Sequence, residues 1–248
     1  MSLAVEIGAL LKHYKGNIEP ALKGIDLKVE KNTIFGLLGP NGAGKTSLIS
    51  ILAGILKPDL GYVKVFEQSV SEKNKNYRRF IGLVPQEIAL YPTLTARENL
   101  TFFGRMYKVP RKELDDKIQY WLKLLGLDQQ QGKLVQAFSG GMKRRLNLIA
   151  ALLHDPDLVI LDEPTVGVDV HSKNILLEQL LELKKQGKTI IYTSHQLEEA
   201  EQICDYLVII DKGCLLTGGT PEKLLHGNFT NVRLEEYFLT ITGKELRD

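Results

Sequence analysis

The chain has 248 residues, of which 44% are hydrophobic and 25% are charged, as in ordinary globular proteins. Its formal net charge of +2 at pH 7 is too small to indicate binding to nucleic acid or to an anionic membrane surface. The two cysteines lack the spacing of a metal site, so we expect free thiols in a reducing compartment.

The predicted elements begin with a small antiparallel sheet that extends to about residue 31. Beyond it, short apolar runs alternate with helical patterns, which predicts a largely parallel sheet with helices packed against it. Unbroken apolar runs, typical of strands buried on both faces, occupy residues 33–38, 80–86, 158–164, 189–195 and 206–210. A helix is expected after the first run, from the spacing of Leu48, Ile51, Leu52 and Ile55. A turn and an edge strand are expected over residues 211–219.

The segment 87–156 lacks strand signals and carries two helical patterns, TARENLTFFGRMY and KELDDKIQYWLKLLGL. We therefore predict a helical subdomain inserted into an α/β core, which is formed by residues 1–86 and 157–225 and includes the N-terminal antiparallel sheet. Together these parts are expected to make one domain.

A glycine-rich loop, GPNGAGKTS, follows the first buried strand and precedes the first helix. It fits the pattern GxxxxGK[ST], in which glycines let backbone N–H groups turn inward around phosphates. In this pattern Lys45 reaches the β- and γ-phosphates and the hydroxyl of Thr46 is a ligand of Mg²⁺. The predicted nucleotide-binding residues are Gly39, Pro40, Asn41, Gly42, Ala43, Gly44, Lys45, Thr46 and Ser47.

A second motif, LVILDE, is a buried strand that ends in two carboxylates. Asp162 is placed to hold the coordination shell of Mg²⁺, directly or through water. Glu163 follows it and is a candidate general base or water-orienting group.

A third motif, SGGMKRRL, opens a helix with a serine and two glycines. Ser139, Gly140 and Gly141 leave N–H donors free at the helix N-terminus, where the helix dipole favours anions. One face of this helix is expected to be apolar, through Met142, Leu146, Ile149, Ala150 and Leu153, and the solvated side is expected to begin with Lys143, Arg144 and Arg145. The chain thus carries two predicted anion sites about a hundred residues apart.

These three motifs, in this order, resemble those of the ATP-binding cassette family, the ATPase subunits of ABC transporters. The resemblance covers essentially the whole chain, although Met142 stands where the family more often has glutamine. It implies an α/β fold with a P-loop NTPase core, a mainly parallel sheet, an N-terminal antiparallel β subdomain and an inserted helical subdomain. Residues 226–248 are then expected to form a C-terminal helical extension.

The resemblance also implies roles for four further residues. Tyr14 would stack on adenine, and Gln86 would contact Mg²⁺ and the attacking water. Asp169 is the aspartate of the loop PTVGVD after the acidic strand, and His195 would sense the γ-phosphate. The implied catalytic set is Glu163, His195 and Gln86, and the implied metal set is Thr46, Gln86 and Asp162.

The family explains the two anion sites, because its subunits form head-to-tail dimers in which each nucleotide lies between the P-loop of one copy and the signature of the other. Ser139, Gly140 and Gly141 would then close the site of a second copy of this chain. A twofold axis makes the two composite sites equivalent.

Two segments resemble ATPases that serve drug, antibiotic or polysaccharide exporters, namely residues 92–109 and 234–248. The implied function is hydrolysis of MgATP to drive a separate membrane permease, with docking expected at the aromatic segment 90–107 and no nucleic-acid partner. The sequence lacks a signal-peptide pattern and a run of ~20 apolar residues. We therefore expect a cytoplasmic subunit attached peripherally to the cytoplasmic face of the inner or plasma membrane through the permease.

Three alternative functions agree less well with these motifs. A non-transport cassette ATPase acting on ribosomes or nucleic acid is disfavoured because the chain has one cassette and no heptad array. A P-loop kinase or GTPase switch would leave the SGGMKRRL motif unexplained, and no N-K-x-D motif is present. A regulatory module without catalysis is disfavoured by the presence of both Lys45 and Glu163.

Overall fold

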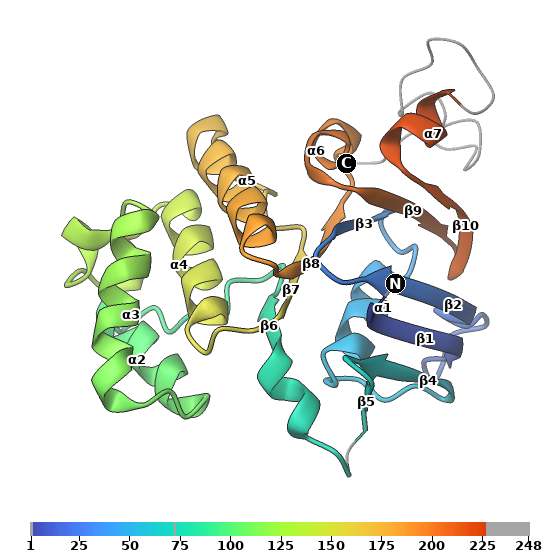
Figure 1. The fold of residues 1–248 in the computed structure, drawn as a ribbon, viewed down its shortest axis with the longest axis horizontal. Helices are drawn as coiled ribbons and strands as arrows, with labels where there is room; N and C mark the ends of the chain where they lie inside the picture. The colour runs from blue at the N-terminus through green and yellow to red at the C-terminus, as the bar shows by residue number, and fades with distance from the viewer. Residues whose placement is uncertain (1, 72, 227–248) are drawn as a thin grey trace.

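The computed structural model describes residues 2–71 and 73–226 (Figure 1). The expected C-terminal extension, residues 226–248, lies outside the described residues except for residue 226, where the last described helix ends. The exporter-like segment 234–248 lies outside them entirely. In the described ranges no helix is both long enough and apolar enough to cross a bilayer. Both cysteines are free, as expected, and burial raises the pKa of the Cys204 thiol.

The central layer is a six-stranded sheet with the order β10-β9-β3-β8-β7-β6. Neighbouring strands pair in parallel except for β10, which pairs antiparallel with β9 at one edge. The bounds are β3 (Ile34–Leu38), β6 (Ile81–Val84), β7 (Leu158–Asp162), β8 (Thr189–Ser194), β9 (Tyr206–Asp211) and β10 (Cys214–Gly219). The continuous apolar runs become strands because all residues of β3, β7 and β8 are buried.

A second sheet, with the order β2-β1-β4-β5, is antiparallel throughout. Its strands are β1 (Leu3–Lys12), β2 (Leu22–Glu30), β4 (Leu60–Val65) and β5 (Gln68–Ser69). The prediction that this sheet ends near residue 31 was therefore wrong, because β4 and β5 come after the first helix. Val63 and Val65 of β4 are buried in the same core as β1, which explains why this later segment joins the sheet.

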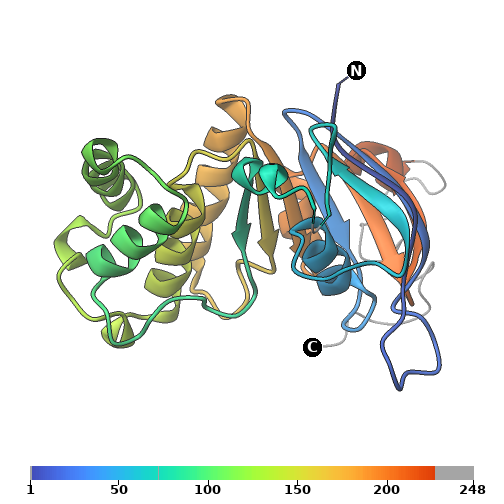
Figure 2. The same ribbon diagram turned by 90° about the horizontal axis from the view of Figure 1, so that it is seen from below.

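The helices divide between two cores. Helix α1 (Lys45–Leu52) packs with the antiparallel sheet and one face of the central sheet, whereas the helices from α2 to α6 share a core on its other face. The bounds of the remaining helices are α2 (Ala96–Met106), α3 (Arg111–Leu124), α4 (Gly140–Leu152), α5 (Val170–Lys185), α6 (Leu197–Ile203) and α7 (Pro221–His226). The 3₁₀ turns are η1 (Asn76–Phe80), η2 (Asp128–Gln130) and η3 (Val135–Ala137). Figure 2 shows α2 and α3 in green and α4 in yellow-green at one end of the molecule, opposite the antiparallel sheet, whose strands run from blue to teal.

This architecture confirms the predicted fold class, while the subdomain boundaries stay a prediction. Two details of the helices were predicted wrongly. Helix α1 ends before Ile55, which is 71% exposed, because Gly54 takes a left-handed φ of 68° directly after the helix. The basic residues 143–145 at the start of α4 are half-buried and do not form a solvated side.

Candidate active site

The glycine-rich loop joins the end of β3 to the start of α1, at the carboxyl edge of the central sheet. Gly44 has a φ of 109°, a backbone conformation that residues other than glycine rarely adopt. A Cβ atom on Gly39 would lie 2.2 Å from the carbonyl oxygen of Ile210. The backbone therefore needs glycine at both positions to turn closely before the helix N-terminus.

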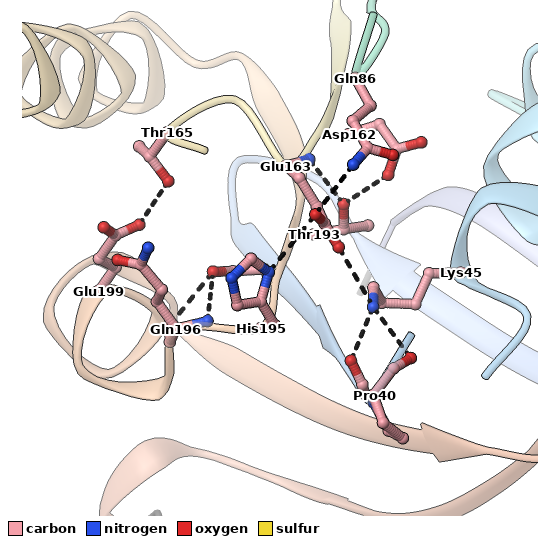
Figure 3. A network of polar contacts seen from close by, with 12 residues as sticks. Pro40, Lys45, Gln86, Asp162, Glu163, Thr165, Thr193, His195, Gln196 and Glu199 are labelled. Atoms are coloured by element: carbon pink, nitrogen blue, oxygen red, sulfur yellow. Dashed lines mark hydrogen bonds and ion pairs between the residues drawn. The ribbon is translucent and has the colours of Figure 1, made fainter. Parts of the chain in front are cut away.

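Lys45 is the first residue of α1, and its amine folds back over this loop. The side chain is only 5% exposed, and Nζ donates to the carbonyl oxygens of Gly39 at 2.7 Å and Pro40 at 3.2 Å. Nζ also lies 3.3 Å from Oε1 of Glu163 (Figure 3). The positive charge is thus buried beside the loop and paired with a carboxylate.

Glu163 is the residue on which the predicted side chains converge. Its Oε2 accepts a hydrogen bond from Nε2 of Gln86 at 3.3 Å and lies 3.4 Å from Nδ1 of His195. Three elements far apart in the sequence therefore bring Lys45, Gln86 and His195 to one carboxylate, as Figure 3 shows.

The backbone of Glu163 is held in an unfavourable conformation. Its φ of 46° lies in the left-handed region, which costs about 1–3 kcal/mol for a residue other than glycine. The N–H of Glu163 donates to Oγ1 of Thr193 at 3.0 Å, and that hydroxyl donates to Oδ1 of Asp162 at 2.8 Å. Thr193 thereby fixes both acidic residues at the end of β7.

Thr193 was missed by the sequence analysis. It pairs with Asp162 across the parallel strands β7 and β8, so its position follows from strand register. The sequence predicted both strands but not their register. Knowledge of the register would have placed Thr193 beside Asp162.

The residues expected to hold Mg²⁺ are a carboxylate, a hydroxyl and a side-chain amide, from Asp162, Thr46 and Gln86. Oxygen donors of this kind fit Mg²⁺, which keeps several waters and binds few protein ligands. Asp162 is 3% exposed, whereas Thr46 and Gln86 are exposed. No cluster of three or more acidic, cysteine or histidine side chains able to bind a metal exists among residues 2–71 and 73–224. A site here would therefore need oxygen atoms from phosphate or water.

Arg144 connects helix α4 to the segment that carries Gln86. Its guanidinium donates to the carbonyl oxygen of Pro85 at 3.4 Å and to that of Gln86. Burial lowers the pKa of Arg144, while the nearby Asp162 and Glu163 carboxylates oppose the shift. These contacts explain why the prediction of a solvated position for Arg144 was wrong.

The predicted signature residues lie in a separate group. Ser139 caps α4 by accepting the N–H of Met142 at 3.2 Å, and Asp169 caps α5 by accepting the N–H of Ser172 at 2.9 Å, a bond that lowers the pKa of Asp169. A Cβ atom on Gly141 would lie 2.3 Å from Oγ of Ser172, so glycine lets the two helix starts touch.

Among the described residues, the hydrogen bonds of this group run to its own helices and not to Lys45 or Glu163. Ser139 and Gly140 are exposed. The structure thus brings Ser139, Gly141 and Asp169 together, apart from the cluster around Glu163.

Tyr14 lies in the loop between β1 and β2, beside the start of α1. Its hydroxyl is 3.1 Å from Oγ of Ser47, the residue is 38% exposed, and Nζ of Lys12 lies over the ring, 5.8 Å from its centroid. The hydroxyl therefore tethers a partly exposed aromatic side chain next to the glycine-rich loop, a position compatible with the predicted stacking role.

We expect Tyr14→Ala to weaken nucleotide binding about ten-fold, because stacking of a base on an aromatic ring contributes ~1–3 kcal/mol and a factor of ten is 1.4 kcal/mol. Tyr14→Phe keeps the ring and loses only the bond to Ser47, so its affinity should stay within about three-fold of the original. Titration with a fluorescent ATP analogue measures both. Equal affinity of the original chain and the alanine variant would show that another residue holds the base.

Comparison with known proteins adds independent findings. A family model described as ABC transporter matches residues 22–166. The chain is 46% identical over 203 residues to the linearmycin resistance ATP-binding protein LnrL of Bacillus subtilis (strain 168), covering 82% of this chain and 65% of that protein. It is 36% identical over 224 residues to the Nod factor export ATP-binding protein I of Bradyrhizobium diazoefficiens, covering 90% of this chain and 72% of that protein.

Solved structures show the same similarity. One described as the ATP binding subunit of an ABC transporter is 28% identical and superimposes with a TM-score of 0.88, covering 96% of this chain and 99% of that one. Another, cbiO1 from Clostridium perfringens, described as part of the ABC transporter complex cbiONQ, is 27% identical with a TM-score of 0.81, covering 90% and 91%.

Proposed function

We propose that this chain, which belongs to the ABC transporter family, hydrolyses MgATP and couples that hydrolysis to export through a separate membrane permease. The observation that carries the proposal is the convergence of Lys45, Gln86 and His195 on the carboxylate of Glu163 beside the glycine-rich loop. The names of the relatives, which refer to linearmycin resistance and Nod factor export, support an exporter.

The residues of the chain divide the chemistry between them. MgATP would supply the phosphoryl group and a metal charge that neutralises it. The backbone N–H groups of residues 41–47 and the amine of Lys45 would bind the phosphates, and Asp162 and Thr46 would hold the metal. Glu163 takes the proton of the attacking water, which Gln86 and His195 help to orient.

The pairing of Lys45 with Glu163 adds an order to these events. With Nζ of Lys45 only 3.3 Å from Oε1 of Glu163, that carboxylate oxygen faces the amine and not a water molecule. When Lys45 binds phosphate instead, Glu163 becomes available to the water. In this account, binding of the substrate itself activates the base.

The position of Ser139 and Gly140 supports a site shared between two copies. Their exposed helix N-terminus is an anion site that makes no bond to the P-loop of its own chain within the described residues. A head-to-tail dimer would place it on the phosphates held by the second copy, with Asp169 beside it. ATP would then hold the two copies together.

The permease would dock on an aromatic surface formed by Tyr91, Phe102 and Met106, which are 46%, 37% and 64% exposed. The rings of Tyr91 and Phe102 lie 5.0 Å apart edge to face, and Phe102 and Met106 line a groove of about 640 Å³. Exposed aromatic and methionine side chains are enriched at protein interfaces. The surface follows Gln86 in sequence, so a movement at the site has a short route to it. Docking would place the chain at the cytoplasmic face of the membrane.

Charged substitutions test this surface. We expect Tyr91→Glu, Phe102→Glu and Met106→Glu together to leave hydrolysis by the isolated chain within about two-fold, since none contacts the Glu163 cluster. Stimulation of hydrolysis by the permease should be lost, because an unpaired charge in an apolar interface costs several kcal/mol. Phosphate release with and without the permease in vesicles measures both quantities. Undiminished binding and stimulation by the permease in the triple variant would exclude this surface as the docking site.

A further inference from the structure

A second buried carboxylate, Glu199 of α6, lies close to the Glu163 cluster but has no part in it. Its side chain is 4% exposed. Oε2 accepts hydrogen bonds from Oγ1 of Thr165 at 2.7 Å and from the hydroxyl of Tyr192 at 2.6 Å. Nζ of Lys173 lies 3.2 Å from Oε1. A buried carboxylate is tolerated only when such partners offset its lost hydration.

The partners of Glu199 come from three other elements. Thr165 lies in the loop that joins β7 to α5, Tyr192 lies on β8, and Lys173 lies in the first turns of α5. One carboxylate therefore ties together the loop after β7 and the segments that precede and follow His195, as Figure 3 shows for Thr165 and Glu199.

The residues that hydrogen-bond to Glu199 lie close in sequence to Glu163 and His195. Thr165 is two residues after Glu163, and Tyr192 and Glu199 flank His195 at three residues before it and four after it. Glu163 and His195 thus each lie within a few residues of a side chain that Glu199 binds. Their separation of 3.4 Å depends on how these segments are held.

Glu163 particularly needs such support, because its left-handed backbone does not persist without surrounding constraints. The turn that follows is closed by the N–H of Val166, which donates to the carbonyl oxygen of Glu163 at 3.3 Å. Thr165 lies within this turn and anchors it to α6. Release of its hydroxyl would free the turn to relax and move the carboxylate.

We propose that Glu199 is a positioning residue for hydrolysis, which holds the Glu163 loop and His195 in reacting geometry through Thr165 and Tyr192. This inference rests on the proposed function of Glu163 and His195. The hydroxyl of Tyr192 stays protonated and keeps donating at neutral pH, because burial and the adjacent Glu199 charge raise its pKa well above the usual value.

The test uses shape-preserving variants of the complete chain. Glu199→Met, which removes the acceptor oxygens at similar length, and Thr165→Val should each lower kcat by on the order of 10- to 100-fold, since a displacement of about 1 Å at a reacting group has an effect of this size. The KM for MgATP should stay within about two-fold, because neither side chain contacts the P-loop. Thr165→Ser keeps the hydroxyl and should restore kcat to within about two-fold of the original chain.

Asp205→Asn is the matched control. Asp205 also joins separate elements, by accepting the N–H of Ile34 at 2.8 Å and pairing with Lys184, but it is not connected to the Glu163 loop. It should lower Tm without changing kcat at a temperature where all variants are folded. The double variant Glu199→Met with Thr165→Val should lose no more kcat than Glu199→Met alone, because loss of the carboxylate already breaks its bond to Thr165.

The inference would be overturned by a kcat within two-fold of the original chain in both single variants, or by a loss in Thr165→Ser equal to that in Thr165→Val. Losses that multiply in the double variant would also contradict it. These outcomes are distinct from failure of the proposed function, which would appear as no phosphate release from MgATP by the unsubstituted chain.

Discussion

Glu163→Gln is expected to lower the turnover of MgATP by roughly 10²–10⁴, the usual contribution of a positioned general base. The amide has the shape of the carboxylate and still accepts a hydrogen bond, but it does not take a proton from water. The affinity for ATP should be retained or rise, because the substitution removes the negative charge that pairs with Nζ of Lys45 at 3.3 Å and competes with phosphate for it. Phosphate release and nucleotide titration measure the two effects separately.

The same variant is expected to accumulate an ATP-bound dimer, visible by size-exclusion chromatography, since the step that ends the bound state is blocked. Glu198→Gln is a suitable control, because Glu198 is an exposed carboxylate on α6 outside the cluster. It should behave like the original chain. Near-normal turnover of Glu163→Gln would remove Glu163 from the catalytic role.

Lys45→Ala and Ser139→Arg are each expected to lower turnover by roughly 10²–10³ or more, the effect of removing one group that stabilises transferred charge. Lys45→Ala leaves the P-loop without its cation. Ser139→Arg puts a bulky charged side chain at the exposed start of α4, where it blocks the signature of the chain that carries it. The lost helix cap also destabilises that variant, by about 1 kcal/mol.

Mixing the two inactive variants is expected to restore about a quarter of the original activity. In a mixed dimer both lesions fall in one composite site, and the other site is built from two intact halves. Random pairing makes half of the dimers mixed, each with one working site of two. If every nucleotide were bound within one chain, each chain would carry a lesion in its own site and mixing would restore nothing.

Local sequence patterns were sufficient to predict the framework of the site. The glycine loop before α1 and the carboxylates at the end of β7 are contiguous motifs whose geometry depends on neighbouring residues. The buried strands were recognisable because β3, β7 and β8 are covered on both faces. The fold class followed from these elements and from the family resemblance, and it is confirmed.

Contacts that depend on register or on the direction of a side chain were not predictable in this way. Thr193 reaches Asp162 only through the pairing of β7 with β8. Arg144 turns inward because its guanidinium donates hydrogen bonds to the backbone carbonyls of Pro85 and Gln86. The charge of Arg144 favoured a solvated position, but its hydrogen bonds to these two backbone carbonyls outweighed it. The buried pair of Lys45 and Glu163 joins two motifs whose spatial relation the sequence does not state.

The most direct test of the shared site is a disulfide between Asn41→Cys and Ser139→Cys, two exposed positions, in a chain that also lacks Cys204 and Cys214 and carries Glu163→Gln to retain ATP. If each site combines the P-loop of one copy with the signature of the other, ATP should promote a bond between chains. A covalent dimer should then appear on a non-reducing gel. A bond that forms only within single chains, with or without ATP, would contradict the account.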